Sequence, residues 1–219
     1  MASINVIEWI NKYAKHIGSD VLEVGAKRYK EHAYLGLREF LAKKRPRSRL
    51  VGCDISAGDE VDVVLDITAP LQDVKSTLPN ETFDSVFCIS VLEHIPEVAS
   101  ACRNISALLN PGGALFVSVP FVFRYHGYPG DLWRFTPEAV MYLFPDIDFL
   151  GNKYSTVTTL EQDDGMSLRD GNLEKMNRFL YRPRSREGKV ARKEAKLAGD
   201  TVEAYSLAPA MINMLGFKK

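Results

Sequence analysis

The chain has no long apolar run and no excess of charge of either sign. Its 219 residues contain no stretch of about 18 consecutive apolar residues, the length that would cross a bilayer. No basic region followed by an apolar core and a small-residue cleavage site stands at its start. Membrane spanning and secretion are therefore disfavoured, and we expect a cytoplasmic protein. The 28 Lys and Arg residues balance 28 Asp and Glu residues, which leaves no overall field to attract nucleic acid.

Cysteine is scarce as well. Cys53, Cys88 and Cys102 are an odd number without CxxC spacing, and two of them lie in apolar, strand-like runs, so we expect reduced residues in the core. No spacing of His, Cys and carboxylates suggests a metal site. The length favours one domain over residues 1–219 rather than two independent ones.

Neither common glycine-rich phosphate-binding fingerprint is present. Residues 20–29, DVLEVGAKRY, read as a buried strand that ends at Gly25, close to the carboxylate of Glu23. A glycine lets the backbone turn where a side chain would collide with a ligand. The following AKRY fits neither GxGxxG nor GxxxxGK[ST]. The stretch thus indicates a nucleotide-type cofactor site, but not a dinucleotide or P-loop site.

Apolar strand-like runs alternate with helix-like segments from Asp20 onward. The strand-like runs are VLEV, RLVGCD, VDVVLD, FDSVFCIS and ALFVSVP, and the helix-like segments are 4–17, 33–44 and 98–109. This alternation favours an α/β, Rossmann-like fold: a doubly wound, mostly parallel sheet with helices on both faces. We divide the chain into an N-terminal helix in 1–18, a cofactor-binding core in 20–120 and an acceptor-side part in 121–219.

The second half is less regular. Residues 110–113, NPGG, are a strong turn signal, and 121–136 has the composition of a structured loop. Thr136 and Pro137 are typical of a helix start, and Pro145 would end that helix. The run 205–217 is either a strand or a short apolar helix. Residues 175–196 contain nine basic residues against two acids, which is either a solvated face or insertion, or a grip on an anionic ligand.

Carboxylates stand where three of these strands end, and ligands of doubly wound sheets bind at that edge. Asp54 could accept hydrogen bonds from two ribose hydroxyls, or it could cap a helix. Asp66 could accept from an adenine amino group with the Ile67 backbone beside the ring, or it could cap its own loop. Glu23 would suit a positively charged cofactor, or it could only hold the loop.

Five motifs stand in the order and spacing of a known family. VLEVG, the acid of VGCDIS, VDVVLDIT, FDSVFCISVLEHIP and LLNPGGALFVSVP together resemble class I S-adenosylmethionine-dependent methyltransferases over residues 20–144. The resemblance is greatest to small members with a VLEH segment, which include enzymes associated with bacterial glycan and lipopolysaccharide synthesis. Lys27 and Tyr29 depart from the family, which usually has glycines there. The resemblance implies that S-adenosyl-L-methionine is bound by Glu23, Gly25, Ala26, Asp54, Ile55, Asp66, Ile67, Ser90, Val91 and Leu92.

The loop YHGYPGDLWRFTP also resembles this subgroup, in which it overlies the methyl donor. His126 is the candidate catalytic base, and Asp131 would orient it or act itself. The residues expected to bind the acceptor are His94, Tyr128, Trp133 and Arg134. Arg134 would pin an anionic acceptor and the aromatic rings would stack on a sugar, while His94 competes with His126 as the base. For each of these residues, packing of the loop is the alternative.

The expected function is methyl transfer from S-adenosylmethionine to an oxygen of a small or glycan-type acceptor. Transfer to nitrogen or to a phosphate or phosphonate oxygen is an alternative, as is a cofactor-binding partner protein without catalysis. A dedicated base need not exist, because positioning an activated donor supplies much of the rate. An NAD-dependent dehydrogenase is disfavoured by the missing GxGxxG. The oligomeric state is left open.

Overall fold

The computed structural model describes residues 4–28, 36–123, 125–126, 129–149, 155–159, 166–167 and 210–219. The strands are β1 Asp20–Val24, β2 Arg49–Asp54, β3 Val63–Val64, β4 Phe83–Ile89, β5 Leu109–Val122, β6 Ile147–Asp148, β7 Ser155–Thr159, β8 Met166–Ser167 and β9 Ala210–Lys218. They form one sheet in the order β3-β2-β1-β4-β5-β9-β7-β8, with β6 also paired to β9. Strands β1 to β5 run parallel, and β9 runs antiparallel to its neighbours.

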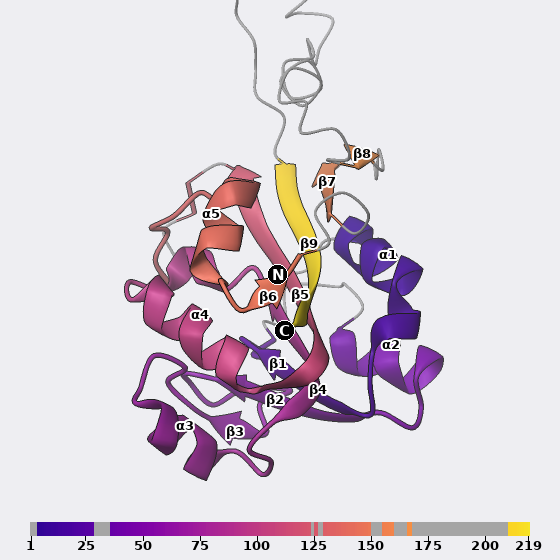
Figure 1. The fold of residues 1–219 in the computed structure, drawn as a ribbon, viewed down its shortest axis with the longest axis vertical. Helices are drawn as coiled ribbons and strands as arrows, with labels where there is room; N and C mark the ends of the chain where they lie inside the picture. The colour runs from indigo at the N-terminus through magenta and orange to yellow at the C-terminus, as the bar shows by residue number, and fades with distance from the viewer. Residues whose placement is uncertain are drawn as a thin grey trace, which may run out of the picture.

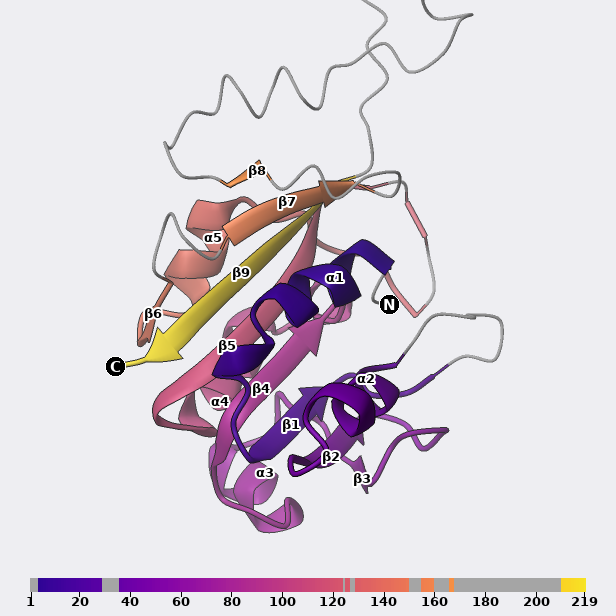
Figure 2. The same ribbon diagram turned by 90° about the vertical axis from the view of Figure 1, so that its right-hand side faces the viewer.

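Helices cover both faces of this sheet (Figures 1 and 2). They are α1 Ile4–Lys12, α2 Leu37–Lys44, α3 Leu71–Thr77, α4 Val98–Ala107 and α5 Pro137–Leu143, with short 3-10 turns η1 Ala14–His16 and η2 Leu92–His94. One apolar cluster joins α1 and α2 to the sheet, and a second joins α3, α4 and α5 to its other face. The expected α/β, Rossmann-like, doubly wound fold is therefore confirmed.

The three cysteines lie in this core. Cys53, Cys88 and Cys102 are all free and buried, as the sequence predicts. Their neighbours are apolar side chains of the sheet and of α4, so each thiol packs as a small hydrophobic group. Among the described residues, no helix has the length and apolar character needed to cross a bilayer.

Two local predictions are corrected by the tertiary structure. The strand expected in VDVVLD is limited to Val63–Val64, which pair with β2, and Asp62 just before it accepts a hydrogen bond from the Gly52 amide at 2.8 Å. The turn expected at 110–113 lies inside the bounds of β5 instead of before it. There the register passes from the pair Phe83–Leu109 to the pair Ser85–Ala114, so residues 110–113 bulge out opposite a single residue of β4.

The C-terminal run is a strand, which settles the choice that periodicity left open. The described part of the run is β9, Ala210–Lys218, which lies between β5 and β7, and residues 205–209 lie outside the described residues. Both of its faces are covered, and Asn213 accepts a buried hydrogen bond from Ser118 of β5 at 2.7 Å. A strand buried on both faces lacks the alternation that distinguishes a strand from a helix.

The cap of α5 is confirmed: Thr136 accepts a hydrogen bond from the Ala139 amide at 3.1 Å, with Pro137 in the first turn. Two predicted features, the Tyr128 side chain and the basic stretch 175–196, lie outside the described residues.

Candidate cofactor and acceptor site

The carboxyl end of β1 turns sharply at Gly25. Its φ angle is +78°, and its amide donates to the Cys53 carbonyl at 2.8 Å. The next amide, of Ala26, donates to the same carbonyl at 3.0 Å. A Cβ atom added to Gly25 would lie 2.3 Å from Cγ2 of Val91, in the segment after β4. Only glycine therefore allows the ends of β1 and β4 to approach this closely.

Asp54 ends β2 beside this turn. Its Oδ2 accepts from the Lys27 amide at 3.3 Å, and its Oδ1 accepts from the Ser56 amide at 3.1 Å. The described residues 55–62 contain no helix, so the alternative that Asp54 caps a helix is wrong. Because these bonds are long, ribose hydroxyls can compete for the carboxylate. The neighbouring Ile55 side chain is 72% exposed at the same edge.

Glu23 is half-buried one residue before the end of β1. Burial raises its pKa to about 8, and the negative charge of Glu60 adds to this rise, while Arg38 and Arg28 oppose it. The carboxyl group therefore holds its proton at neutral pH. A cationic ligand beside it would favour the ionised form, whereas a pyrophosphate would not.

The residues expected beside the adenine make their hydrogen bonds to other residues of the protein. Asp66 is exposed and accepts from the amide and hydroxyl of Thr68 at 2.8 and 2.7 Å, which is the loop-capping alternative. Ile67 is buried, and its carbonyl accepts from Asn104 of α4 at 2.7 Å. These contacts fix the loop that follows β3, and they leave its role toward a cofactor as a prediction.

The segment after β4 begins with a strained residue. Ser90 has a φ of +55°, and its amide donates to the Ser118 carbonyl at 2.8 Å. Val91 packs against Gly25, as described above. Leu92 is fully buried in the core, and its expected part in the wall beside the cofactor stays a prediction.

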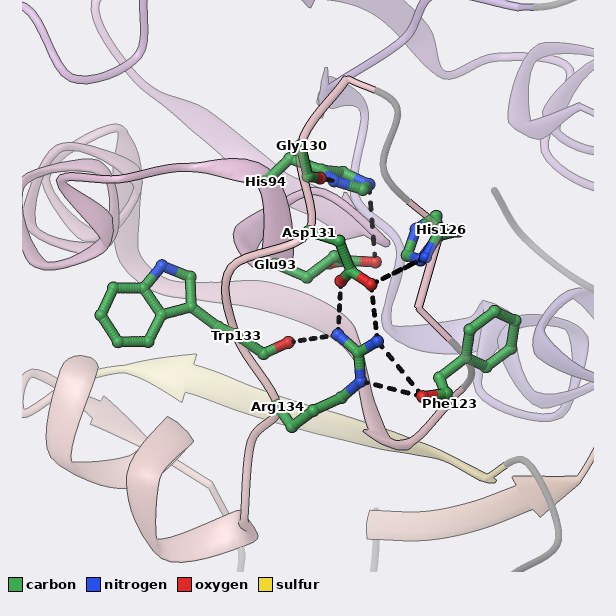
Figure 3. Close-up of polar contacts among 8 residues, drawn as sticks. All are labelled: Glu93, His94, Phe123, His126, Gly130, Asp131, Trp133 and Arg134. Atoms are coloured by element: carbon green, nitrogen blue, oxygen red, sulfur yellow. Dashed lines mark hydrogen bonds and ion pairs between the residues drawn. The ribbon is translucent and has the colours of Figure 1, made fainter.

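Asp131 is the centre of the loop that follows β5 (Figure 3). Its side chain is only 1% exposed, and both carboxylate oxygens bind the guanidinium of Arg134, Oδ2 at 2.7 Å from Nη2. Arg134 holds the pKa of this carboxyl well below its usual range. Asp131 Oδ2 also accepts from the His126 amide at 3.0 Å and lies 3.1 Å from His126 Nδ1. Asp131 thus positions His126 and stays ionised.

The same loop is fastened to η2 and its surroundings. The Leu132 amide donates to the Glu93 carbonyl at 2.8 Å, and the Trp133 indole donates to the Ile95 carbonyl at 2.8 Å. Arg134 donates to the carbonyls of Trp133 and Phe123 as well as to Asp131. The polar groups of Trp133 and Arg134 therefore hold the loop in place. This favours the alternative in which these residues pack the loop over the one in which they bind an acceptor directly.

Glu93 is a candidate site residue that the prediction from sequence missed. It lies on η2, and only 2% of the residue is exposed to solvent. Its Oε2 atom has no hydrogen-bond partner among the described residues. Burial raises its pKa to about 7. His94 Nε2 lies 3.9 Å from Glu93 Oε1, and the rings of His94 and His126 are 5.1 Å apart, edge to face. The signal in the sequence is an acid in the short segment that follows a buried strand.

The parallel sheet, the glycine turn and the strand-end carboxylates define an α/β, Rossmann-like fold, in which this edge of the sheet is the usual place for a nucleotide-type cofactor. Residues 35–115 match the family described as "Methyltransferase domain". A ubiquinone biosynthesis O-methyltransferase of Coxiella burnetii is 33% identical over 66 residues, which are 30% of this chain and 28% of that protein. The chain thus spans less than a third of the length of this curated relative.

Solved structures share the fold at low sequence identity. A SAM-dependent methyltransferase from Archaeoglobus fulgidus aligns with a TM-score of 0.53 at 16% identity, over 97% of this chain and 93% of that one. The N-methyltransferase NodS from Bradyrhizobium japonicum, in complex with S-adenosylhomocysteine, aligns with a TM-score of 0.51 at 13% identity. The alignment covers 99% of this chain and 88% of that one. At this identity the two structures show the shared fold alone, and it is the domain match that indicates the expected enzyme class, a methyltransferase that uses S-adenosylmethionine. The VLEH subgroup stays a prediction.

Proposed function

We propose that the protein is an S-adenosylmethionine-dependent methyltransferase that methylates an oxygen atom of a small or glycan-type acceptor. The observation that carries this proposal is the meeting of two groups of residues at one edge of the sheet. Glu23, Gly25 and Asp54 end β1 and β2, and the loop bearing His126 is fastened to η2, directly after β4. The close approach of Gly25 to Val91 joins the two groups.

The residues present fit this cofactor. Glu23 and Gly25 would lie beside its methionine part, Asp54 beside the ribose, and Asp66 with Ile67 beside the adenine. The fit is supported by the pKa of Glu23, which is raised in a way that a cation would reverse. When bound, the cofactor supplies a methyl group on a sulfonium, which is already an activated donor.

On the acceptor side, His126 is the group that we assign to the acceptor oxygen, with Asp131 as its positioning residue. In the simplest chemistry the neutral imidazole takes the hydroxyl proton, as expected from the sequence. Transfer to oxygen is favoured by this imidazole and by the O-methyltransferase among the relatives. Transfer to nitrogen or to a phosphate oxygen is the second candidate. The free, buried cysteines suit the expected cytoplasmic location.

Two substitutions should separate cofactor binding from acceptor chemistry. His126→Ala is expected to lower turnover at least about tenfold with cofactor affinity nearly unchanged. Asp54→Ala is expected to weaken cofactor binding about tenfold or more, because a charge-assisted hydrogen bond contributes roughly 1.5 to 3 kcal/mol. Transfer from labelled S-adenosylmethionine measures the first effect, and calorimetry with S-adenosylhomocysteine measures the second. Unchanged turnover in His126→Ala would remove His126 from the acceptor chemistry.

The enzyme class itself is tested by calorimetry with S-adenosylhomocysteine and with NAD in separate titrations. We expect binding of the first only, and binding of NAD alone would overturn the proposal. Labelled methyl transfer to a panel of glycan, phenol, phosphonate and amine acceptors then identifies the acceptor atom. Cofactor binding without turnover on the whole panel would favour a non-catalytic partner protein.

Glu23 gives a prediction for the pH dependence of cofactor binding. Its pKa is about 8 in the free protein, where Glu60 opposes and Arg38 and Arg28 favour ionisation. A cationic cofactor lowers this pKa, so binding below pH 8 should release a proton and the affinity should rise from pH 6 to pH 8. Calorimetry in buffers of different ionisation enthalpy measures this release. Glu23→Gln should abolish it, and a flat affinity in the unchanged protein would contradict the prediction.

A further inference from the structure

Three side chains on the acceptor side bring possible metal-ligand atoms close together. Glu93 and His94 come from η2, and His126 comes from the loop after β5 (Figure 3). Each offers one ligand atom, and the three atoms all lie within 4.8 Å of one another. No metal-ligand spacing is apparent in the sequence, since His126 lies far from the other two residues along the chain.

We propose that Glu93, His94 and His126 bind a divalent transition metal ion, and that this ion holds the oxygen of the methyl acceptor. Two imidazole nitrogens and one carboxylate oxygen are ligands that suit Zn²⁺, Fe²⁺, Co²⁺ or Mn²⁺, with open positions left for water or a substrate. Atoms that share such an ion at about 2.1 Å lie at most about 4.2 Å apart, so the three side chains close inward slightly when it binds.

The orientation of both imidazoles supports this assignment. His94 Nδ1 contacts the carbonyl of Gly130, so Nδ1 carries the hydrogen and Nε2 presents its lone pair toward Glu93. The His126 amide donates to Asp131 Oδ2, which lies 3.1 Å from His126 Nδ1, and Asp131 is itself fixed by Arg134. A histidine that binds a metal is commonly oriented in this way, by a carbonyl or carboxylate on its other nitrogen.

The state of Glu93 supports it independently. Oε2 of this buried carboxylate has no hydrogen-bond partner among the described residues. An unpartnered buried carboxylate is costly, and a bound cation is one of the few groups that offset the cost. The unpartnered oxygen, Oε2, and the oxygen that faces His94, Oε1, belong to the same carboxyl group.

The role given to the ion rests on the proposed function. The ion would bind an acceptor hydroxyl and lower the pKa of that hydroxyl. The proton leaves to solvent, the oxygen electron pair forms the new O–C bond, and the S–C bond of the methyl donor breaks to leave a neutral thioether. With the ion bound, His126 acts as a ligand and no longer takes the proton itself.

Metal binding is tested without reference to turnover. The full-length protein is freed of metal with a chelator and titrated with Co²⁺, Mn²⁺ and Zn²⁺ by calorimetry, and Co²⁺ is also followed by its visible absorption. We expect one ion per chain in the unchanged protein and in Glu97→Gln, an exposed acid of the same segment. Glu93→Gln and His126→Ala should each weaken binding at least about tenfold.

Circular dichroism shows whether each variant folds, and His126→Ala keeps the test usable if Glu93→Gln does not fold. Absence of binding in the unchanged protein, or binding that neither substitution weakens, would overturn the metal site. The role of the ion is tested by methyl transfer with metal-free and metal-loaded protein, which should differ at least about tenfold. Equal turnover would overturn that role while leaving the methyltransferase proposal intact. Loss of all turnover in both forms, with metal still bound, would count against the methyltransferase proposal instead.

Discussion

Asp131→Ala is expected to lower the free energy of unfolding by about 3 kcal/mol and to abolish most turnover. The substitution removes a carboxylate that is 1% exposed and leaves Arg134 and the His126 amide without their shared partner. Breaking a buried charge pair costs about 3–5 kcal/mol, and the partial exposure of Arg134 places the effect at the lower end. Denaturant unfolding measures the stability, and labelled methyl transfer measures the turnover.

The exposed acid Glu81 provides the matched control, because Glu81→Ala removes a carboxylate outside the site and should change stability by no more than about 0.5 kcal/mol. Asp131→Asn keeps the shape of the side chain but not its charge. Its loss of stability should lie between those of Asp131→Ala and Glu81→Ala. If Asp131→Ala unfolds like the unchanged protein, the loop is not held by this carboxylate and His126 is positioned in some other way.

Gly25→Ala is expected to weaken cofactor binding at least about tenfold and to destabilise the protein by more than its backbone strain alone. The φ of +78° costs a residue with a Cβ roughly 1–2 kcal/mol. The added atom would also lie 2.3 Å from Val91 Cγ2, so the ends of β1 and β4 must separate at the cofactor edge. Denaturant unfolding and calorimetry with S-adenosylhomocysteine measure the two effects.

Gly112→Ala separates strain from collision. Gly112 has a similar φ of +74°, but an added Cβ meets nothing within 4 Å. It should therefore show the strain alone, with cofactor binding unchanged. Combining Gly25→Ala with Val91→Ala should recover part of the lost affinity, because the colliding methyl group is then absent. No recovery would mean that the backbone conformation, and not the contact with Val91, limits binding.

Much of the fold was predictable because it depends on local pattern. The apolar runs ending at Val24, Asp54 and Ile89 became parallel strands, and the cap at Thr136 formed as expected. The division of the chain into one domain remains a prediction. Two bounds were wrong: β3 is limited to Val63–Val64, and residues 110–113 bulge opposite β4 inside β5.

In the candidate site, too, some features follow from local sequence pattern and others from contacts between distant residues. The edge that we propose for the cofactor could be predicted from the sequence, because the glycine and the carboxylates stand at strand ends and parallel strands bring their ends to one edge. The contacts on the proposed acceptor side could not be predicted in this way, because they depend on the tertiary structure. It joined Arg134 to Asp131 within the loop and brought His126 beside Glu93 and His94. Burial and the closeness of side chains far apart in the chain set these partnerships, and neither can be read from spacing.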